Sequence, residues 1–414
     1  MRAVAKSPGR LKRAADMGHR AATRWASALL AAAAMLSPVA ATAQAEPPRR
    51  AWAAPDTDSQ GHEQVRALAA ALGADRIRIE PSASHISRLR MLRDGRVQLA
   101  ATSVTGSFFA QEGLFAYAAA DIGPQPVRIV LTNMSTQLLG IAVAADAGIA
   151  SVADLKGKRV VQVSGSPELR QHLSGLLAHG GLDWNDVKVV PVNGYRAAVE
   201  AVIANRADAM FAASSSPDLQ KLAKSPRGLS WPVVAHADQL GWERLRQFTP
   251  YLLPVDATEG AGLSDKAPVE STNWPYPVLI TLARRSAEEV YQTTRELITR
   301  YRSYRDQAPG NAGWDARRQP FSWAIPWHDG AIKAFREQGV WTDAHQAHND
   351  GLVRRQQILR EAWDALRREA IMKADDEKPD EAAWLSARAH ALRKAGLDSL
   401  MSETPLTPAP ASKP

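Results

Sequence analysis

The sequence has no cysteine among its 414 residues, and this absence removes several classes of protein from consideration. Disulfide scaffolds, cysteine-ligated zinc or iron–sulfur sites and thiol nucleophiles all need that side chain. Phosphate-binding motifs are also missing, since neither a P-loop nor a G-x-G-x-x-G segment is present, and H-E-x-x-H and G-x-S-x-G do not occur. We therefore predict a protein that is not an enzyme and that holds no cofactor and no metal.

The chain lacks a basic surface of the kind that binds nucleic acid, although its formal net charge is +8. Residues 1–45 hold seven Lys and Arg against one acidic residue, and the remainder holds 44 basic and 42 acidic side chains. The positive charge therefore belongs mostly to the N-terminus, and we expect no nucleic-acid partner.

The N-terminal segment has the order of a secretory signal peptide. A basic stretch precedes the apolar run 25–37, and small residues follow around Ala43. That run is shorter than the roughly 20 apolar residues that span a bilayer. We predict a signal peptide at 1–45, starting at Met1 or Met17, and a periplasmic mature chain in which the lack of cysteine avoids oxidation. An uncleaved anchor or a mitochondrial presequence stays open as the alternative.

The rest of the chain divides by composition and periodicity. Residues 46–60 are rich in Pro and Ala and are typical of a linker. Short β-type runs then alternate with helical patterns up to residue 341, which predicts parallel βαβ layers. From 342 to 400 an apolar stripe without strand signals predicts a helical extension. The proline-rich residues 401–414 are expected to form a disordered tail.

Several segments resemble known families. The run ADLKGKRV (153–160) is similar to a turn found throughout type II periplasmic solute-binding proteins. LRMLRDGRVQL (89–99), GLDWNDVKVVPVNG (181–194), YPVLITLARRSAEEVY (276–291) and PWHDGAIKAFREQGVW (326–341) resemble the TAXI family, the solute-binding subunits of one branch of TRAP transporters. Together the resemblance covers roughly residues 60–341.

The resemblance implies an α/β fold with two lobes, parallel or mixed sheets and crossing strands. Lobe 1 would take residues 61–145 and 235–341, and lobe 2 would take 146–234. It also implies a small organic anion as ligand, such as a dicarboxylate or an amino acid, held between the lobes. The partners would be TRAP membrane permease subunits, to which the closed form delivers its ligand.

One departure from the family leaves a second interpretation open. The family's Gly-rich first loop, which lines the ligand cleft, is replaced by the segment 54–61, where Ser59 and Gln60 are available as donors. Together with the added C-terminal helices, this departure also fits a periplasmic sensor or interaction protein with altered or lost ligand binding.

Hydroxyl and amide side chains follow the predicted strands, where ligands of open α/β sheets bind. Unpaired N–H groups at helix starts such as Ser166-Pro167 and Ser216-Pro217 suit a carboxylate. Each serine taken singly is better explained as a helix N-cap, and the concentration of polar strand ends favours the ligand-binding interpretation of the group. The predicted ligand-binding residues are Ser59, Ser103, Thr105, Ser135, Ser164, Ser166, Asn193, Tyr195, Ser214, Ser215 and Trp274.

Charged and imidazole side chains give weaker signals. Arg88, Arg128 and Arg196 are candidates for a bidentate bond to an anionic ligand, with a solvated surface position as the alternative for each. His345 and His348 stand about one helical turn apart, but a zinc site needs further ligands, so we expect a solvated helix start. A hydrolase with a serine nucleophile lacks an assembled triad in the sequence.

Overall fold

The computed structural model describes residues 50–73, 75–119, 122–372 and 381–399. All of them belong to one compact unit that spans Pro47–Pro414. The predicted signal peptide, the first residues of the predicted linker and the predicted tail lie outside the described residues. Among the helices that the structure describes, none combines the length and the apolar character needed to cross a membrane.

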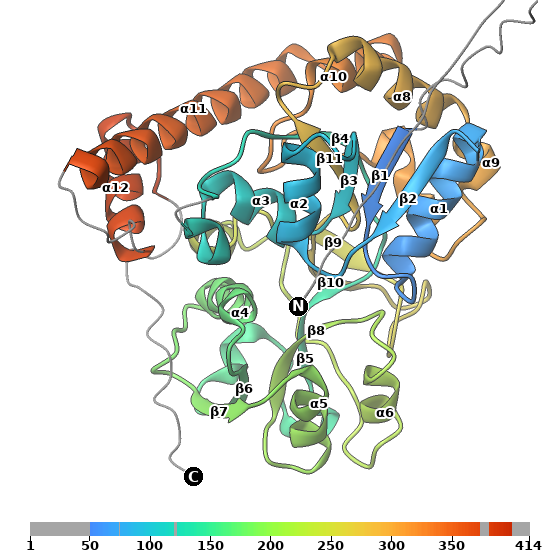
Figure 1. Ribbon diagram of the computed structural model, residues 1–414. Coiled ribbons are helices and arrows are strands. Elements are labelled where there is room, and N and C mark those ends of the chain that lie inside the picture. Colours follow the sequence, from blue (N-terminus) through green and yellow to red (C-terminus); the bar gives the residue numbers. More distant parts are fainter. Residues whose placement is uncertain (1–49, 74, 120–121, 373–380, 400–414) are drawn as a thin grey trace, which may run out of the picture. The chain divides into compact units, whose positions relative to one another are not determined.

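The first lobe is built on a five-stranded mixed sheet with the order β2-β1-β3-β11-β4 (Figure 1). Its strands are β1 (Arg50–Ala54), β2 (Ile77–Pro81), β3 (Leu99–Thr102), β4 (Val127–Thr132) and β11 (Val278–Leu282). β1 pairs in parallel with β2 and β3, and β11 runs antiparallel between β3 and β4. Because the chain steps from β1 outward to β2 and back across to β3, right-handed crossovers put the two connecting helices on opposite faces.

The helices of this lobe cover both faces of the sheet. They are α1 (Gln60–Gly73), α2 (His85–Arg93), α3 (Val104–Glu112), α8 (Ala287–Thr299), α9 (Tyr301–Tyr304) and α10 (Asp329–Glu337), with short 3₁₀ turns at Phe115–Ala118, Asn311–Trp314 and Ala316–Arg318. α2 packs with α3, while α1 and α10 both pack with α8. Ser84 caps α2 and Ser103 caps α3, each accepting from a backbone N–H of the first turn. These caps fix where both helices leave the strand ends.

The second lobe repeats the strand pattern of the first. Its four-stranded sheet has the order β5-β8-β6-β7, formed by β5 (Leu139–Val143), β6 (Arg159–Val163), β7 (Lys188–Val192) and β8 (Ala209–Ala213). β6 is parallel to β7 and β8, and β5 is antiparallel to β8. Its elements also include α4 (Pro167–His179), α5 (Tyr195–Ile203), α6 (Leu219–Ala223) and α7 (Gln239–Phe248), with 3₁₀ turns at Ala145–Ala147 and Val152–Leu155.

Two segments cross between the lobes side by side. The link from β4 to β5 and the link from β10 (Val269–Asn273) to β11 are joined by bonds from Asn273 Nδ2 to the Ser135 carbonyl (2.8 Å) and from Tyr276 N to the Asn133 carbonyl (2.8 Å). β10 also pairs antiparallel with β9 (Leu253–Ala257). The predicted mixed α/β fold with crossing strands is thereby confirmed.

The hydrophobic core continues from the first lobe into the second. One cluster contains the buried residues of the five-stranded sheet together with Leu173 and Leu176 of α4 and Leu245 of α7. A second cluster lies under α5 and α6, on the other face of the four-stranded sheet. The α4 face of the second lobe therefore shares its interior with the first.

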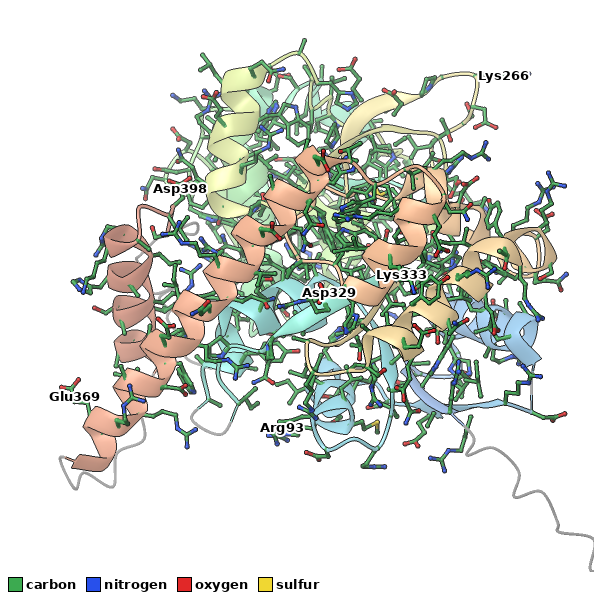
Figure 2. The ribbon with its side chains drawn as sticks, turned by 90° about the horizontal axis from the view of Figure 1, so that it is seen from above. Arg93, Lys266, Asp329, Lys333, Glu369 and Asp398 are labelled. Carbon is green, nitrogen blue, oxygen red and sulfur yellow. The ribbon has the colours of Figure 1, made fainter. Side chains whose placement is uncertain are left out.

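The predicted C-terminal extension forms two helices, α11 (Asp343–Met372) and α12 (Glu381–Lys394). They pack around Trp363 and Trp384, whose rings meet edge to face with centroids 5.0 Å apart. Arg355 of α11 and Arg388 of α12 both donate to the buried carboxylate of Glu112 at the end of α3. Figure 2 shows Asp398 beyond α12, where its carbonyl accepts from Arg355. The extension is thus bonded to the first lobe.

Four local expectations differ from the structure. The expected linker contains β1, which is buried because its small residues and Trp52 lie between two neighbouring strands. β5 belongs to the second sheet, so the lobe boundary precedes residue 139 rather than 146. Residues 232–235, where the sequence predicts a strand, contain a single isolated bridge from Val233 to Ser151, and β9 and β10 were not predicted. α6 begins after Asp218 rather than at Ser216-Pro217.

Candidate functional site

A polar cluster lies at the carboxyl ends of β2 and β3 in the first lobe. His85, the first residue of α2, places Nδ1 2.7 Å from the Arg88 guanidinium and 3.0 Å from Thr102 Oγ1. Because an arginine N–H can only donate, Nδ1 is the acceptor and the ring proton belongs on Nε2. Nε2 lies 3.4 Å from Ser103 Oγ. Burial, followed by the charge of Arg88, lowers the pKa of His85 to about 4, which keeps it neutral at pH 7.

Arg88 is a buried cation without an acidic partner. Its residue is only 2% exposed, and its two terminal nitrogens donate to the Ser82 carbonyl and to His85. Its Nε has no hydrogen-bond partner. In the part of the chain that the structure describes, no carboxylate forms an ion pair with it, and the exposed Asp56 acts on it only from a distance. A buried charge is normally paired, because desolvation is costly.

A cavity of about 210 Å³ opens beside this cluster. Ser84, His85 and Thr105 supply polar wall atoms, and Phe115 and Tyr117 supply rings. Burial raises the pKa of the Tyr117 hydroxyl, so it is protonated and can donate. The predicted residues Ser103 and Thr105 therefore lie at one site, together with His85, which the sequence reading did not select.

The wall of this cavity also includes one residue of the second lobe, Glu168 in the first turn of α4. Glu168 is half-buried and forms no ion pair with any residue that the structure describes. A carboxylate in the first turn of a helix is favoured by the helix dipole. The cavity thus has a buried guanidinium behind one wall and a carboxylate on another.

Four predicted residues follow strands of the second lobe. Ser164 follows β6 and donates its N–H to the Val192 carbonyl (2.8 Å), which places it beside Asn193; both are exposed. Ser166 is the N-cap residue of α4 without a side-chain cap bond, and Tyr195 begins α5. Burial raises the pKa of Tyr195. None of the four lines the cavity beside His85.

Ser214 and Ser215, after β8, are bonded within the protein. The buried Ser214 hydroxyl accepts from Leu138 N (2.9 Å) and donates to the Glu259 carbonyl (2.6 Å). Ser215 donates to Gln137 (2.7 Å). These bonds join the end of β8 to the β4–β5 link and to the loop between β9 and β10.

The remaining predicted residues occupy a turn and the crossing segments. Ser59 accepts from His62 N and donates to the Asp56 carbonyl, so it stabilises the start of α1. Ser135 is buried and its carbonyl accepts from Asn273. Trp274 is buried against Phe211 of β8, with nearly parallel rings 5.9 Å apart.

Trp274 belongs to an aromatic cluster that joins the lobes. The ring centroid of His172, on α4, lies 4.7 Å from that of Trp274. His172 Nδ1 forms a 2.7 Å hydrogen bond with the Tyr251 hydroxyl. Phe109 of α3 packs on both His172 and Tyr251. Burial lowers the pKa of His172 to about 3 and raises that of Tyr251, so both side chains are neutral.

Other candidates from the sequence lie elsewhere. Arg128 donates to the Val127 carbonyl and to Gln356 of α11, and burial lowers its pKa to about 10. Arg196 is exposed on α5. His345 accepts from Thr342 N and His348 bonds the Trp323 carbonyl, so each imidazole has its own backbone partner.

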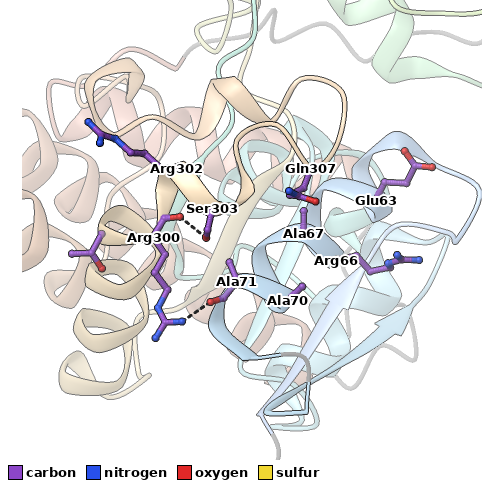
Figure 3. A pocket seen from close by; sticks show the side chains of 10 residues that line it. Glu63, Arg66, Ala67, Ala70, Ala71, Arg300, Arg302, Ser303 and Gln307 are labelled. Carbon is purple, nitrogen blue, oxygen red and sulfur yellow. Dashed lines mark hydrogen bonds between the residues drawn. The ribbon is translucent and has the colours of Figure 1, made fainter.

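A larger groove of about 900 Å³ lies between α1 and residues 299–307 (Figure 3). Arg66, Arg300 and Arg302 line it with Ala67 and Ala71, and Arg300 donates to the Ala71 carbonyl (2.8 Å). Its lining contains no residue from a strand end and none from the second lobe. We therefore take the smaller cavity beside Arg88 as the candidate ligand site.

Sequence reasoning missed His85 and Glu168. His85 was detectable as the first helical residue after a Ser84 cap that follows a strand. Glu168 stands one residue after a proline helix start, but nothing in the sequence says that it faces another lobe. Arg88 was named only as one of three arginines, because burial is not visible in a helix with few apolar residues.

Comparison with known proteins gives a family match over part of the chain. Residues 77–238 match the family described as NMT1/THI5 like. This segment runs from β2 to the residue before α7 and covers less than half of the chain. Among curated proteins, no relative matches.

Several similar solved structures are named as binding proteins. The periplasmic aliphatic sulphonate binding protein SsuA from Escherichia coli is 15% identical, with a TM-score of 0.40, and covers 81% of this chain and 96% of its own. The second substrate binding domain of a putative amino acid ABC transporter from Streptococcus pneumoniae is 13% identical (TM-score 0.37; 64% and 99% covered). The probable amino-acid ABC transporter extracellular-binding protein ytmK from Bacillus subtilis is 13% identical, with a TM-score of 0.37. The match covers 64% of this chain and 98% of that protein.

The names of these three proteins describe binding proteins. At such identities and TM-scores they say nothing about the ligand of this chain. None of the three names a TRAP transporter, so the TAXI assignment stays a prediction.

Proposed function

We propose that this chain is an extracytoplasmic solute-binding protein that takes up a small organic anion beside Arg88. The observation that carries the proposal is the buried guanidinium without an acidic partner, directly behind the wall of a cavity. An anionic ligand would supply the missing negative charge where the surroundings strengthen electrostatic attraction.

The cavity wall favours an amino acid over a dicarboxylate. The ligand carboxylate would accept from His85 Nε2 and Thr105, with Arg88 behind them. Its ammonium group would then lie toward Glu168, which has no ion-pair partner among the described residues. A second carboxylate at that position would be repelled. Because Glu168 belongs to the other lobe, such a ligand would favour the conformation in which both lobes contact it.

The delivery partner would be a membrane permease of the TRAP type, as the TAXI resemblance over roughly residues 60–341 implies. The predicted signal peptide is consistent with a periplasmic location. Adjacent genes test this part separately: a TRAP permease pair supports it, while an ATP-binding transporter subunit beside the gene would contradict the TRAP assignment and leave ligand binding untouched.

Ligand binding is tested by calorimetry and thermal shift with the chain lacking its predicted signal peptide. A panel of amino acids and dicarboxylates is titrated into the wild type, R88M, R88K and R196A. We expect at least one amino acid to bind the wild type, R88M to lose at least tenfold in affinity, and R88K to keep part of it. R196A alters an exposed arginine and serves as the matched control. Binding that is equal in R88M and wild type would contradict the site.

A second candidate function is an interaction protein without a small ligand. The aromatic cluster of Phe109, His172, Phe211, Tyr251 and Trp274 favours it, since it packs the two lobes together through buried rings. Native mass spectrometry separates the two candidates: a small molecule carried through purification supports ligand binding, and its absence together with a silent panel supports the second function.

A further inference from the structure

Three side chains of metal-ligand type meet on the β9–β10 strand pair. They are His236, Asp256 and Glu270, and one ligand atom from each lies within 4.8 Å of the other two. Asp256 and Glu270 stand directly opposite each other in the antiparallel register of β9 and β10. His236 comes from the segment that precedes α7, far from both in sequence. No residue spacing could have indicated this group, because the three positions belong to separate elements.

The two carboxylates are not neutralised by a basic side chain. Like charges directly opposite on neighbouring strands destabilise the pair. In the described part of the chain, neither Asp256 nor Glu270 forms an ion pair with Lys or Arg, and the single charge partner is His236, with Nδ1 3.8 Å from Asp256 Oδ1. Lys266, on the loop that joins the two strands (Figure 2), forms no ion pair with them. The pair therefore presents an uncompensated negative charge.

The imidazole is held in a fixed orientation. His236 N donates to Glu270 Oε2 (2.8 Å), and Val234 N donates to the Glu270 carbonyl (3.0 Å), so this segment runs along β10. His236 Nε2 lies 3.3 Å from the Ser271 carbonyl, and its ring meets Trp242 edge to face at 6.3 Å. With Nε2–H donating to Ser271, the Nδ1 lone pair faces the carboxylates. Metal-binding histidines characteristically donate their second nitrogen in this way.

We propose that His236 Nδ1 and one oxygen each of Asp256 and Glu270 bind a divalent cation of the zinc type, with water in the remaining position. Imidazole together with carboxylates suits Zn²⁺, whose ligand distances are about 2.0–2.2 Å. The three atoms lie within 4.8 Å of one another, and the two carboxylates are exposed, so their side chains are free to turn toward a common ion. This site is separate from the cavity beside Arg88 and does not depend on the proposed function.

A bound ion would fasten the start of α7 to the strands that lead back to the first lobe. The segment before α7 already bonds β10 through residues 234 and 236. The ion would add β9 to the same connection and remove the repulsion between the opposed carboxylates. An ion that binds the folded chain but not the unfolded chain would raise the melting temperature.

The test titrates Zn²⁺ by calorimetry into the chain without its predicted signal peptide, after treatment with chelator and dialysis. We expect one ion per chain in the wild type and at least tenfold weaker binding in H236A and D256N. The control H390A removes an exposed histidine on α12, outside the cluster, and keeps the wild-type affinity. A Zn²⁺-dependent rise in melting temperature should appear in the wild type and H390A but not in H236A.

Two results would overturn the proposal. Absence of Zn²⁺ binding in the wild type would mean that His236, Asp256 and Glu270 lie together without serving as metal ligands. Equal affinity in H236A and wild type would place any bound ion elsewhere on the chain. A visible absorption spectrum of the Co²⁺-loaded chain adds a direct readout: a change in H236A supports nitrogen ligation, and identical spectra contradict it.

Discussion

The two lobes share a strand pattern, yet the ends of their corresponding strands are used differently. In each lobe the chain runs through three parallel strands with the first in the middle, and a fourth strand pairs antiparallel with the third. After β3, Ser103 lies beside the half-buried His85, which bonds the buried Arg88, at an open cavity. After β8, at the corresponding position, Ser214 uses its hydroxyl on two backbone groups of the same protein.

The charged groups of the two lobes differ as well. The first lobe buries Arg88 without a carboxylate and Glu112 with two arginines. The second lobe has its main charge group, Arg159, Asp208 and Arg227, at the amino ends of β6 and β8, where the buried Asp208 pairs with both arginines and Arg227 also reaches the half-exposed Asp146. For Ser103 and Ser214, the contacts of neighbouring segments rather than the strand order thus decide whether a strand-end hydroxyl stays available.

The largest effect is expected for Glu112→Gln, which leaves Arg355 and Arg388 buried without a carboxylate. Removing one partner of a buried ion pair costs about 3–5 kcal/mol. Urea unfolding should show a loss of this size. The matched change in the second lobe, Asp146→Asn, breaks a surface pair and should cost less than about 1 kcal/mol. Equal losses of stability in the two variants would contradict the difference between the buried pair of Glu112 and the surface pair of Asp146.

Acid should weaken the first lobe in two steps. The folded-state pKa of His85 is about 4, below its ordinary 6.5, so the unfolded chain takes up the proton first and stability falls from pH 6.5 toward 4. Burial alone raises the pKa of Glu112, but Arg355 and Arg388 hold it at about 2, so its contribution is present above pH 4.5 and is lost as the pH falls toward 2.

Urea midpoints measured from pH 7 to pH 2.5 check both steps. His85→Gln should reduce the upper step, although His172 contributes there with its pKa of about 3. Glu112→Gln should remove much of the lower step. A flat profile between pH 6.5 and 4 would show that His85 is not held neutral.

Ser214→Ala should cost about 1–3 kcal/mol, because it leaves buried backbone groups without a partner. Ligand affinity should stay unchanged in this variant. Ser103→Ala removes a helix cap, at about 1 kcal/mol, and should also weaken ligand binding several-fold. Urea unfolding measures the loss of stability in each variant, and calorimetry then measures the loss of ligand affinity separately. Weaker binding in Ser214→Ala would mean that the second lobe contributes its strand ends after all.

The smallest effect is expected for Ser164→Ala, since this side chain is exposed and makes no described side-chain bond. Stability should stay within about 0.5 kcal/mol of wild type. A loss of affinity at unchanged stability would extend the site to the end of β6, as the sequence predicts. Unchanged affinity would confine the site to the first lobe and Glu168.

Periodicity and capping residues were sufficient to predict most elements. Ser84 and Ser286 cap α2 and α8 where the sequence predicts helix starts, and the alternating residues 76–80 predict the strand observed as β2. β1 was missed because RAWAA lacks β-branched residues and follows two prolines. Its strand conformation comes from neighbours on both sides, which local sequence does not contain.

The site was predictable in part. Strand-end hydroxyls are visible in sequence, but their use is not. Ser103 and Ser214 look alike as residues, and only the contacts of neighbouring segments distinguish an available hydroxyl from one that bonds Leu138 and Glu259. The isolation of Arg88 from every described carboxylate is likewise a property of packing.

The position of β11 has a consequence for the order of folding. This strand, at residues 278–282, lies between β3 and β4, which end by residue 132. The first sheet therefore cannot close until the whole intervening segment has been synthesised and its ends brought together, whereas the four strands of the second sheet span only residues 139–213. Local pairing is the faster process. We expect the inserted lobe to form first and to bring β11 to the gap in its neighbour.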